Sequence, residues 1–228
     1  MITERTDKFN LKRLENNYIL NEESKRLMKQ YLIIERDYRY ALREMSAKLE
    51  NLNDYCEMTF YHNPIHHMES RLKTPDTILE KMYRRNYSID LNTLKEYIYD
   101  IAGVRVICKY VNDIYHIINL LREQKDLKIK LIKDYIKNPK PTGYRSIHVV
   151  FNMEIYIDST IRVVPVEIQF RTIAMDMWAS LEHELRYKSN NKLSEEEEKA
   201  LSKYADDLYN IDVKMQDLYL NIDSTPNE

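Results

Sequence analysis

Apolar side chains in the first quarter of the chain recur at three- and four-residue steps. The set runs Leu27, Tyr31, Ile34, Tyr38, Ala41, Met45, Leu49 and Leu52. This spacing predicts one long amphipathic helix, and Asn21 followed by Glu23 provides a cap region at its start. A shorter helix is expected over residues 76–85, because Pro75 suits a first helical turn.

The middle of the chain alternates between β-branched runs and amphipathic segments. Strands are predicted at residues 104–108, 147–156 and 161–170, and helices at residues 111–121 and 172–188. Asp158 and Ser159 are expected to form the turn between the last two strands. Strands interleaved with helices predict a mixed α/β fold. We expect a mixed central sheet of about five strands flanked by helices.

A third periodic segment closes the chain. Ser194 followed by a run of glutamates that begins at Glu195 is typical of a helix cap with an acidic first turn. The apolar positions that follow have strict heptad spacing, which places them in one seam: Leu201, Tyr204, Leu208, Ile211, Met215, Leu218 and Ile222. Such a seam packs either on its own domain or against another subunit. We expect a helical extension at residues 1–60, a catalytic domain at 61–189 and an acidic, oligomerising helix at 190–228.

Composition narrows the class of protein. The 228 residues are 43% hydrophobic, which is enough for one sizeable core. The formal net charge of −2 gives no general case for a nucleic-acid or membrane protein. The sequence shows no long apolar run, so we expect neither a signal peptide nor a membrane span. The two cysteines form no disulfide framework, which fits a reducing cytoplasm. Both of the only glycines, Gly103 and Gly143, fall inside polar motifs.

Charge is distributed unevenly along the chain. Residues 122–145 hold eight Lys or Arg and three acids, whereas residues 190–228 hold four Lys and ten acids. The basic stretch is either a solvated surface or a patch for polyphosphate.

Four polar clusters can carry chemistry. The first joins Arg71 and Lys73 to Thr77 and Lys81 across the start of a predicted helix, which resembles a polyphosphate cradle. The second reads Asp100-Ile-Ala-Gly-Val-Arg105, and an aspartate beside a nucleotide site is a common Mg²⁺ ligand.

The other two clusters follow the basic stretch. Cations, Tyr144 and His148 surround a Pro-Gly loop over residues 133–148, where a tyrosine is free to stack on a purine. In the fourth, strand alternation puts Glu167, Gln169 and Arg171 on one face, where they face either solvent or a cleft.

These four blocks, in this order, resemble the RelA/SpoT synthetase domain over about residues 61–188. The small size and the flanking helices resemble the stand-alone small alarmone synthetases, RelQ type. The resemblance implies a nucleotidyltransferase-like fold, Mg²⁺, and transfer of pyrophosphate from ATP to the 3′-hydroxyl of GDP or GTP, with GMP as a third acceptor to test. AMP would be released and (p)ppGpp, the alarmone of the stringent response, would be formed.

The resemblance also assigns roles to individual residues. It implies that Asp100 and Glu167 hold the metal and that Glu167 takes the proton of the acceptor hydroxyl. The implied ATP-binding residues are Arg71, Lys73, Thr77, Lys81 and Arg105, with the two arginines sandwiching adenine. The implied residues for GDP or GTP are Lys133, Lys140, Tyr144, His148, Gln169 and Asp176, with Tyr144 stacked on guanine.

Relatives of this type imply further properties. They imply a homo-oligomer, either a tetramer or a dimer. They also imply an allosteric (p)ppGpp site, in which His67 stands where relatives stack an aromatic side chain on the effector. Long members of the family carry a hydrolase domain with a His-Asp metal motif. This chain has no His-Asp dipeptide, so we expect no alarmone hydrolysis. Three alternatives are a single-stranded RNA-binding regulator, an inactive oligomeric scaffold and a nucleotidyltransferase that releases pyrophosphate.

Overall fold

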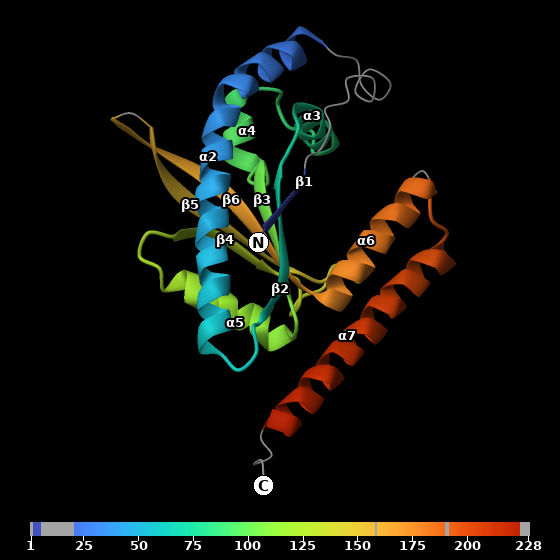
Figure 1. The fold of residues 1–228 in the computed structure, drawn as a ribbon. Coiled ribbons are helices and arrows are strands. Elements are labelled where there is room, and N and C mark those ends of the chain that lie inside the picture. The colour runs from blue at the N-terminus through green and yellow to red at the C-terminus, as the bar shows by residue number, and fades with distance from the viewer. Residues whose placement is uncertain (1, 6–20, 158, 190–191, 224–228) are drawn as a thin grey trace.

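The computed structural model describes residues 2–5, 21–157, 159–189 and 192–223. Its centre is a six-stranded mixed sheet with the order β1-β2-β3-β6-β5-β4 (Figure 1). The strands are β1 (Ile2–Arg5), β2 (Ile65–Leu72), β3 (Ala102–Cys108), β4 (Lys128–Asp134), β5 (Ile147–Ile157) and β6 (Thr160–Thr172). β1 pairs with β2, and β3 with β6, in parallel, whereas the other three neighbouring pairs are antiparallel.

The helices surround this sheet. They are α2 (Glu22–Thr59), α3 (Pro75–Arg84), α4 (Leu91–Tyr97), α5 (Val111–Arg122), α6 (Ile173–Lys188) and α7 (Glu195–Asp223). The Asn21 side chain accepts a hydrogen bond from the Ser24 amide at the start of α2, which confirms the expected cap. At the start of α7 the Ser194 hydroxyl accepts from the Glu197 amide, as the sequence predicts.

The mixed α/β class is confirmed, but the sheet has six strands rather than about five. The chain also forms β1, β2, β4 and α4, which the hydrophobic pattern did not predict as elements. β4 alternates cations with Ile and Leu at the sheet edge, so its pattern is read more easily as a basic surface. The turn expected at Asp158 lies partly outside the described residues, between the observed ends of β5 and β6.

One face of the sheet is apolar and is covered by α2. The buried stripe of α2 joins the inward side chains of β3, β5 and β6 in a single core, for example Met45 with Val104, Phe151 and Ile168. α5 contributes to the same core. The other side chains of β3 and β6, such as Arg105 and Glu167, therefore point to the opposite, polar face.

α6 and α7 form a hairpin that starts at the end of β6 and projects beside the sheet (Figure 1). A small separate cluster of Trp178, Ala179 and Ala205 holds the hairpin together, and the Trp178 indole donates to the Leu201 carbonyl at 3.0 Å. Within the described ranges, no helix is both long and apolar enough to cross a membrane.

Candidate active site

The strand register gathers polar residues into a row across the uncovered face. Glu69, Arg105, Gln169, His148 and Lys133 are successive partners on β2, β3, β6, β5 and β4. Residues distant in sequence thus become neighbours because each lies opposite the next in the ladder.

A second row runs parallel to the first, two residues away along each of β2, β3 and β6. Arg5, Arg71, Gly103 and Glu167 are successive partners on β1, β2, β3 and β6. Gly103 contributes no side chain, so the face is open between Arg71 and Glu167. An open recess of about 530 Å³ lies there, lined by Arg5, Glu69, Arg71, Asp100, Gly103, Val104, Arg105, Glu167 and Gln169.

Asp100 joins two lysines at one side of the recess. Its two carboxylate oxygens accept from Lys73 Nζ and Lys81 Nζ, each at 2.7 Å. The Lys73 amide donates to the Ile101 carbonyl at 2.8 Å, which fixes the end of β2 beside Asp100. Burial alone would raise the pKa of Asp100, but the two ammonium groups outweigh it and hold the pKa well below its usual range. Asp100 is therefore ionised at neutral pH.

Burial also changes the pKa of a lysine in this cluster. The Lys73 side chain is 10% exposed, and burial lowers its pKa although Asp100 acts in the opposite direction. Thr77 lies in the first turn of α3, where its hydroxyl donates to the Thr74 carbonyl at 2.9 Å. Lys73, Thr77 and Lys81 are not among the residues that line the recess, and the two lysines adjoin it through their contacts with Asp100.

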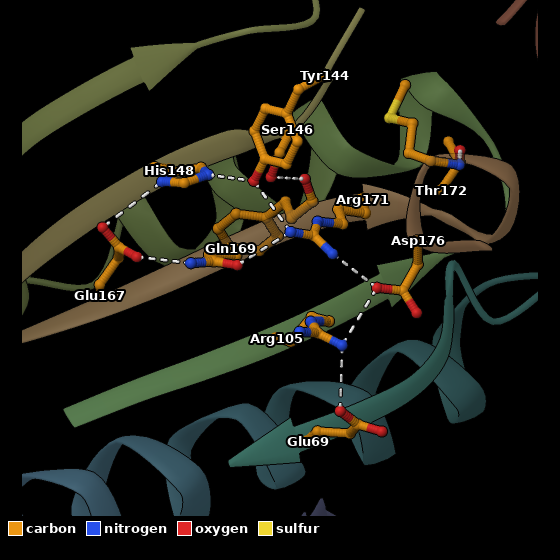
Figure 2. A network of polar contacts seen from close by, with 12 residues as sticks. Glu69, Arg105, Tyr144, Ser146, His148, Glu167, Gln169, Arg171, Thr172 and Asp176 are labelled. Carbon is orange, nitrogen blue, oxygen red and sulfur yellow. Dashed lines mark hydrogen bonds and ion pairs between the residues drawn. The ribbon is translucent and has the colours of Figure 1, made fainter. Parts of the chain in front are cut away.

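Glu167 occupies the centre of the polar face. Gln169 Nε2 donates to Glu167 Oε1 at 2.8 Å, and His148 Nδ1 lies 3.5 Å from Glu167 Oε2 (Figure 2). Burial would raise the pKa of Glu167, but the contacts with His148 and Gln169 lower it overall. The carboxylate is ionised and held in place by two neighbours.

A chain of polar contacts continues from Glu167 across the polar face to Asp176 on α6 and Arg105 on β3. His148 Nε2 lies 2.7 Å from the Tyr144 hydroxyl, which accepts from Arg171 at 3.0 Å (Figure 2). Arg171 donates to Asp176 at 2.9 Å, and Asp176 also pairs with Arg105 at 3.3 Å. Asp176, in the first turn of α6, thus links the strand cations to the helix.

The loop of residues 135–146 lies beside His148, outside the set of residues that line the recess. Lys140 Nζ lies 4.4 Å from the centre of the Tyr144 ring, and burial lowers the pKa of Lys140. Arg145 donates to Asp206 on α7 at 2.8 Å. Gly143 has a φ of 89°, and a Cβ there would lie 2.6 Å from the Cβ of Ala205. The loop therefore leans directly on α7.

The structure places most of the expected site residues around one face. Asp100, Arg71, Arg105, Glu167 and Gln169 line the recess. Lys133, Lys140, Tyr144, His148 and Asp176 lie along the polar row or the adjoining loop. Sequence reasoning assigned no role to Arg5, Glu69 or Arg171. Strand alternation alone pointed to Arg171, whereas Arg5 and Glu69 depended on two strands that the pattern did not predict.

The carboxylates of Asp100 and Glu167 fit a divalent cation. Both line the recess, both are ionised, and the charge of Asp100 acts unfavourably on that of Glu167, so a cation between them would relieve repulsion. Across the described ranges, no group of three or more His, Cys, Asp or Glu side chains is placed to hold a metal. Two carboxylates supplemented by substrate phosphates are a usual Mg²⁺ arrangement.

Comparison with known proteins gives a consistent result. Residues 70–192 match the family model described as the region found in RelA / SpoT proteins. GTP pyrophosphokinase YwaC of Bacillus subtilis is 40% identical over 186 residues, 82% of this chain and 89% of that protein. GTP pyrophosphokinase YjbM of the same organism is 35% identical over 181 residues, 79% of this chain and 84% of that protein.

Solved structures agree in fold. Small alarmone synthetase 2 from Bacillus subtilis superposes with a TM-score of 0.76 at 38% identity, covering 84% of this chain and 98% of that chain. Small alarmone synthetase 1 from the same organism, bound to its product pppGpp, gives a TM-score of 0.78 at 33% identity, covering 85% of this chain and 98% of that chain. With its ordered motifs, its sheet and these relatives, the chain belongs to the RelA/SpoT family and resembles the small alarmone synthetases within it.

Proposed function

We propose that this enzyme transfers the pyrophosphate group of ATP to the 3′-hydroxyl of GDP or GTP, forming (p)ppGpp and AMP. The observation that carries the proposal is the central position of ionised Glu167, between an arginine-lined recess and the Tyr144 loop. The relatives named as GTP pyrophosphokinases and the pppGpp bound to one of them support the same reaction.

We assign the donor nucleotide to the side of β2, α3 and β3, which we call the donor half. Arg71 and Arg105 hold adenine between their guanidinium planes, an arrangement that lysine cannot reproduce. Lys73 and Lys81 bind the phosphates at the positive end of α3, and the hydroxyl of Thr77 turns from the Thr74 carbonyl to donate to them.

We assign the guanosine nucleotide to the Tyr144 loop and the adjoining strands, the acceptor half. Tyr144 stacks on guanine, while Lys133, Lys140 and His148 contact the phosphates. Gln169 holds Glu167, and Asp176 lies near the guanine edge while it fixes Arg171 and Arg105.

The chemical step forms one phosphorus–oxygen bond and breaks another. The 3′-oxygen of the acceptor bonds to the β-phosphorus of ATP, the bond from that phosphorus to the α–β bridging oxygen breaks, and AMP leaves. The hydroxyl proton passes to Glu167, whose ionised state prepares it to accept. A loose transition state makes little demand on the strength of this base, so cations on the phosphates carry most of the stabilisation.

A divalent cation, Mg²⁺ as the first candidate, would bind Asp100 and Glu167. It would neutralise the charge that develops on the phosphates and bring two anionic nucleotides together. Lys73 and Lys81 hold Asp100 in position before the nucleotide arrives.

We also propose that the enzyme self-associates through α7 and works in the cytoplasm, where its substrates are found. On α7, Tyr204, Ile211, Met215, Leu218 and Ile222 of the predicted seam are each more than half exposed. A tetramer is the first assembly to test, by light scattering of wild type and of Ile211→Glu. His67 is exposed on β2, and activation by added (p)ppGpp would give it an effector role.

Radiolabel transfer tests the reaction. Purified enzyme is mixed with Mg²⁺, γ-labelled ATP and, in separate reactions, GMP, GDP or GTP. We expect label on a guanosine nucleotide with an equal amount of AMP. Glu167→Gln should reduce kcat by about 10²–10⁴-fold, whereas Glu154→Gln, on the outer part of β5, should match wild type. Release of pyrophosphate, or absence of both products, would overturn the proposal.

A further inference from the structure

The N-terminal strand extends the arginine row past Arg71. β1 pairs in parallel with β2 at the edge of the sheet (Figure 1). In this register Arg5 lies directly opposite Arg71. Ile2 packs against the core beneath the sheet. Because strand side chains alternate, Arg5 shares the opposite face with the recess, and it is one of the lining residues.

β1 is anchored at its first described residue. The Ile2 amide donates to Glu50 Oε1 on α2 at 2.9 Å, and the Ile2 side chain packs on the core that α2 shares with the sheet. Arg5 is therefore positioned by an edge strand with both a backbone ladder and an apolar attachment.

Arg5 belongs to a group of three arginines that line the recess. Burial and the like charge of Arg171 lower the pKa of Arg105, and Arg5 is close enough to add to this effect. Arg5, Arg71 and Arg105 thus direct three guanidinium groups at one recess whose floor at Gly103 has no side chain. Glu69, Asp100 and Glu167 line the same recess, so its charges are mixed. A polyphosphate held together with a divalent cation would satisfy both the guanidinium groups and the carboxylates.

The sheet order assigns this arginine to one substrate. β1 lies beyond β2 at the edge farthest from β4 and β5, which carry the acceptor half. We propose that Arg5 is a further binding residue for the donor nucleotide, contacting the phosphates of ATP from the β1 edge. The proposal rests on the proposed function, because it takes the Arg71 and Arg105 recess as the ATP site.

Steady-state kinetics of the full chain tests the proposal. We expect Arg5→Ala to raise KM for ATP by about tenfold, as loss of a charged hydrogen bond does, with KM for the guanosine acceptor within about twofold of wild type. Arg5→Lys keeps the charge and should give an intermediate KM, because it loses the planar fork. Arg26→Ala removes an exposed arginine at the start of α2 and should leave both KM values unchanged.

A second pair of variants separates binding from strand docking. Ile2→Asn should detach β1 and raise KM for ATP as Arg5→Ala does, and the double variant should be no worse than either. Wild type that makes product while Arg5→Ala keeps its KM for ATP would overturn this inference alone. Equal increases in both KM values would also overturn it, whereas wild type that releases no AMP would refute the proposed function itself.

Discussion

The donor and acceptor halves of the site are supported in different ways. The donor half is built on β2, β3 and α3, which share the main core beneath α2. The acceptor loop instead leans on α7. The α6–α7 hairpin has a small separate cluster around Trp178, and Met175 and Tyr209 attach it to the main core. The donor half is thus part of the sheet, whereas the position of the acceptor loop depends on how α7 is docked.

Two half-buried carboxylates show the same contrast. Asp100 in the donor half meets two lysines, which hold its pKa well below the usual range. Asp212 on α7 meets only the hydroxyl of Thr172, and burial raises its pKa. The donor half is preorganised for charged ligands, while the α7 contact carries an electrostatic cost at neutral pH.

The largest expected effect comes from removing the charge of Asp100. Asp100→Asn leaves the buried Lys73 without its counter-ion, so we expect a loss of about 3 kcal/mol in the free energy of unfolding without ligands. Urea denaturation measures it. Asp126→Asn breaks only an exposed contact with Lys48 and should cost less than about 1 kcal/mol. Equal losses in the two variants would contradict the preorganised donor half.

The two glycines distinguish the halves by mechanism. At Gly143 the backbone is left-handed and a Cβ would clash with Ala205, so Gly143→Ala should cost about 1–3 kcal/mol in stability and raise KM for the acceptor. At Gly103 a Cβ would meet backbone oxygens only at 3.8 and 3.9 Å. Gly103→Ala should therefore keep the melting temperature but lower kcat/KM for ATP by filling the recess. Thermal melts and steady-state kinetics of both variants test this difference. A lower melting temperature for Gly103→Ala than for Gly143→Ala would contradict it.

The pKa of Asp212 predicts how α7 docking responds to pH. Its folded pKa lies above the unfolded value near 3.8, so stability from this group is fully present below pH 3.8 and falls as pH rises through the folded pKa. Asp212→Asn should therefore be more stable than wild type at pH 7, by up to about 1 kcal/mol. The difference should vanish as pH falls toward 3.8. A variant less stable than wild type at pH 7 would disprove the stated cost.

The smallest effect is expected at the surface contact between the loop and α7. Asp206 is 61% exposed, so its ion pair with Arg145 is weak. Asp206→Ala should raise KM for the guanosine acceptor about twofold and leave KM for ATP unchanged. The exposed neighbour Asp207, replaced by Ala, serves as the matched control. A change in KM for ATP would show that the halves are not independent.

Sequence patterns were sufficient where contacts are local. The α2 stripe, its Asn21 cap and the Ser194 cap of α7 were predicted because periodicity and capping act within a few residues. β5 and β6 were predicted because their apolar alternation is strong. β1 has a single apolar residue among four, so its pairing to β2 gave no comparable signal.

The face on which α7 packs was decided by tertiary structure. Of the heptad seam, Leu201 and Leu208 pack against the Trp178 cluster, whereas Tyr204, Ile211 and Met215 are exposed. The helix also packs through a face that contacts Gly143, Arg145, Thr172, Asn112 and His62 from Ala205, Asp206, Asp212, Gln216 and Tyr219. Tyr209 of the same helix also packs against the main core, so the packing face combines part of the heptad seam with residues outside it.

The sequence by itself determined the family, the reaction class and the kinds of side chain needed, because the four motifs occur in a fixed order along the chain. Only the tertiary structure decided which of them touch: Asp100 meets Lys73 and Lys81 from 27 and 19 residues away. It also brought Arg5 beside Arg71. The physical reason is that strand register and helix docking depend on burial of the whole core, which no local pattern specifies.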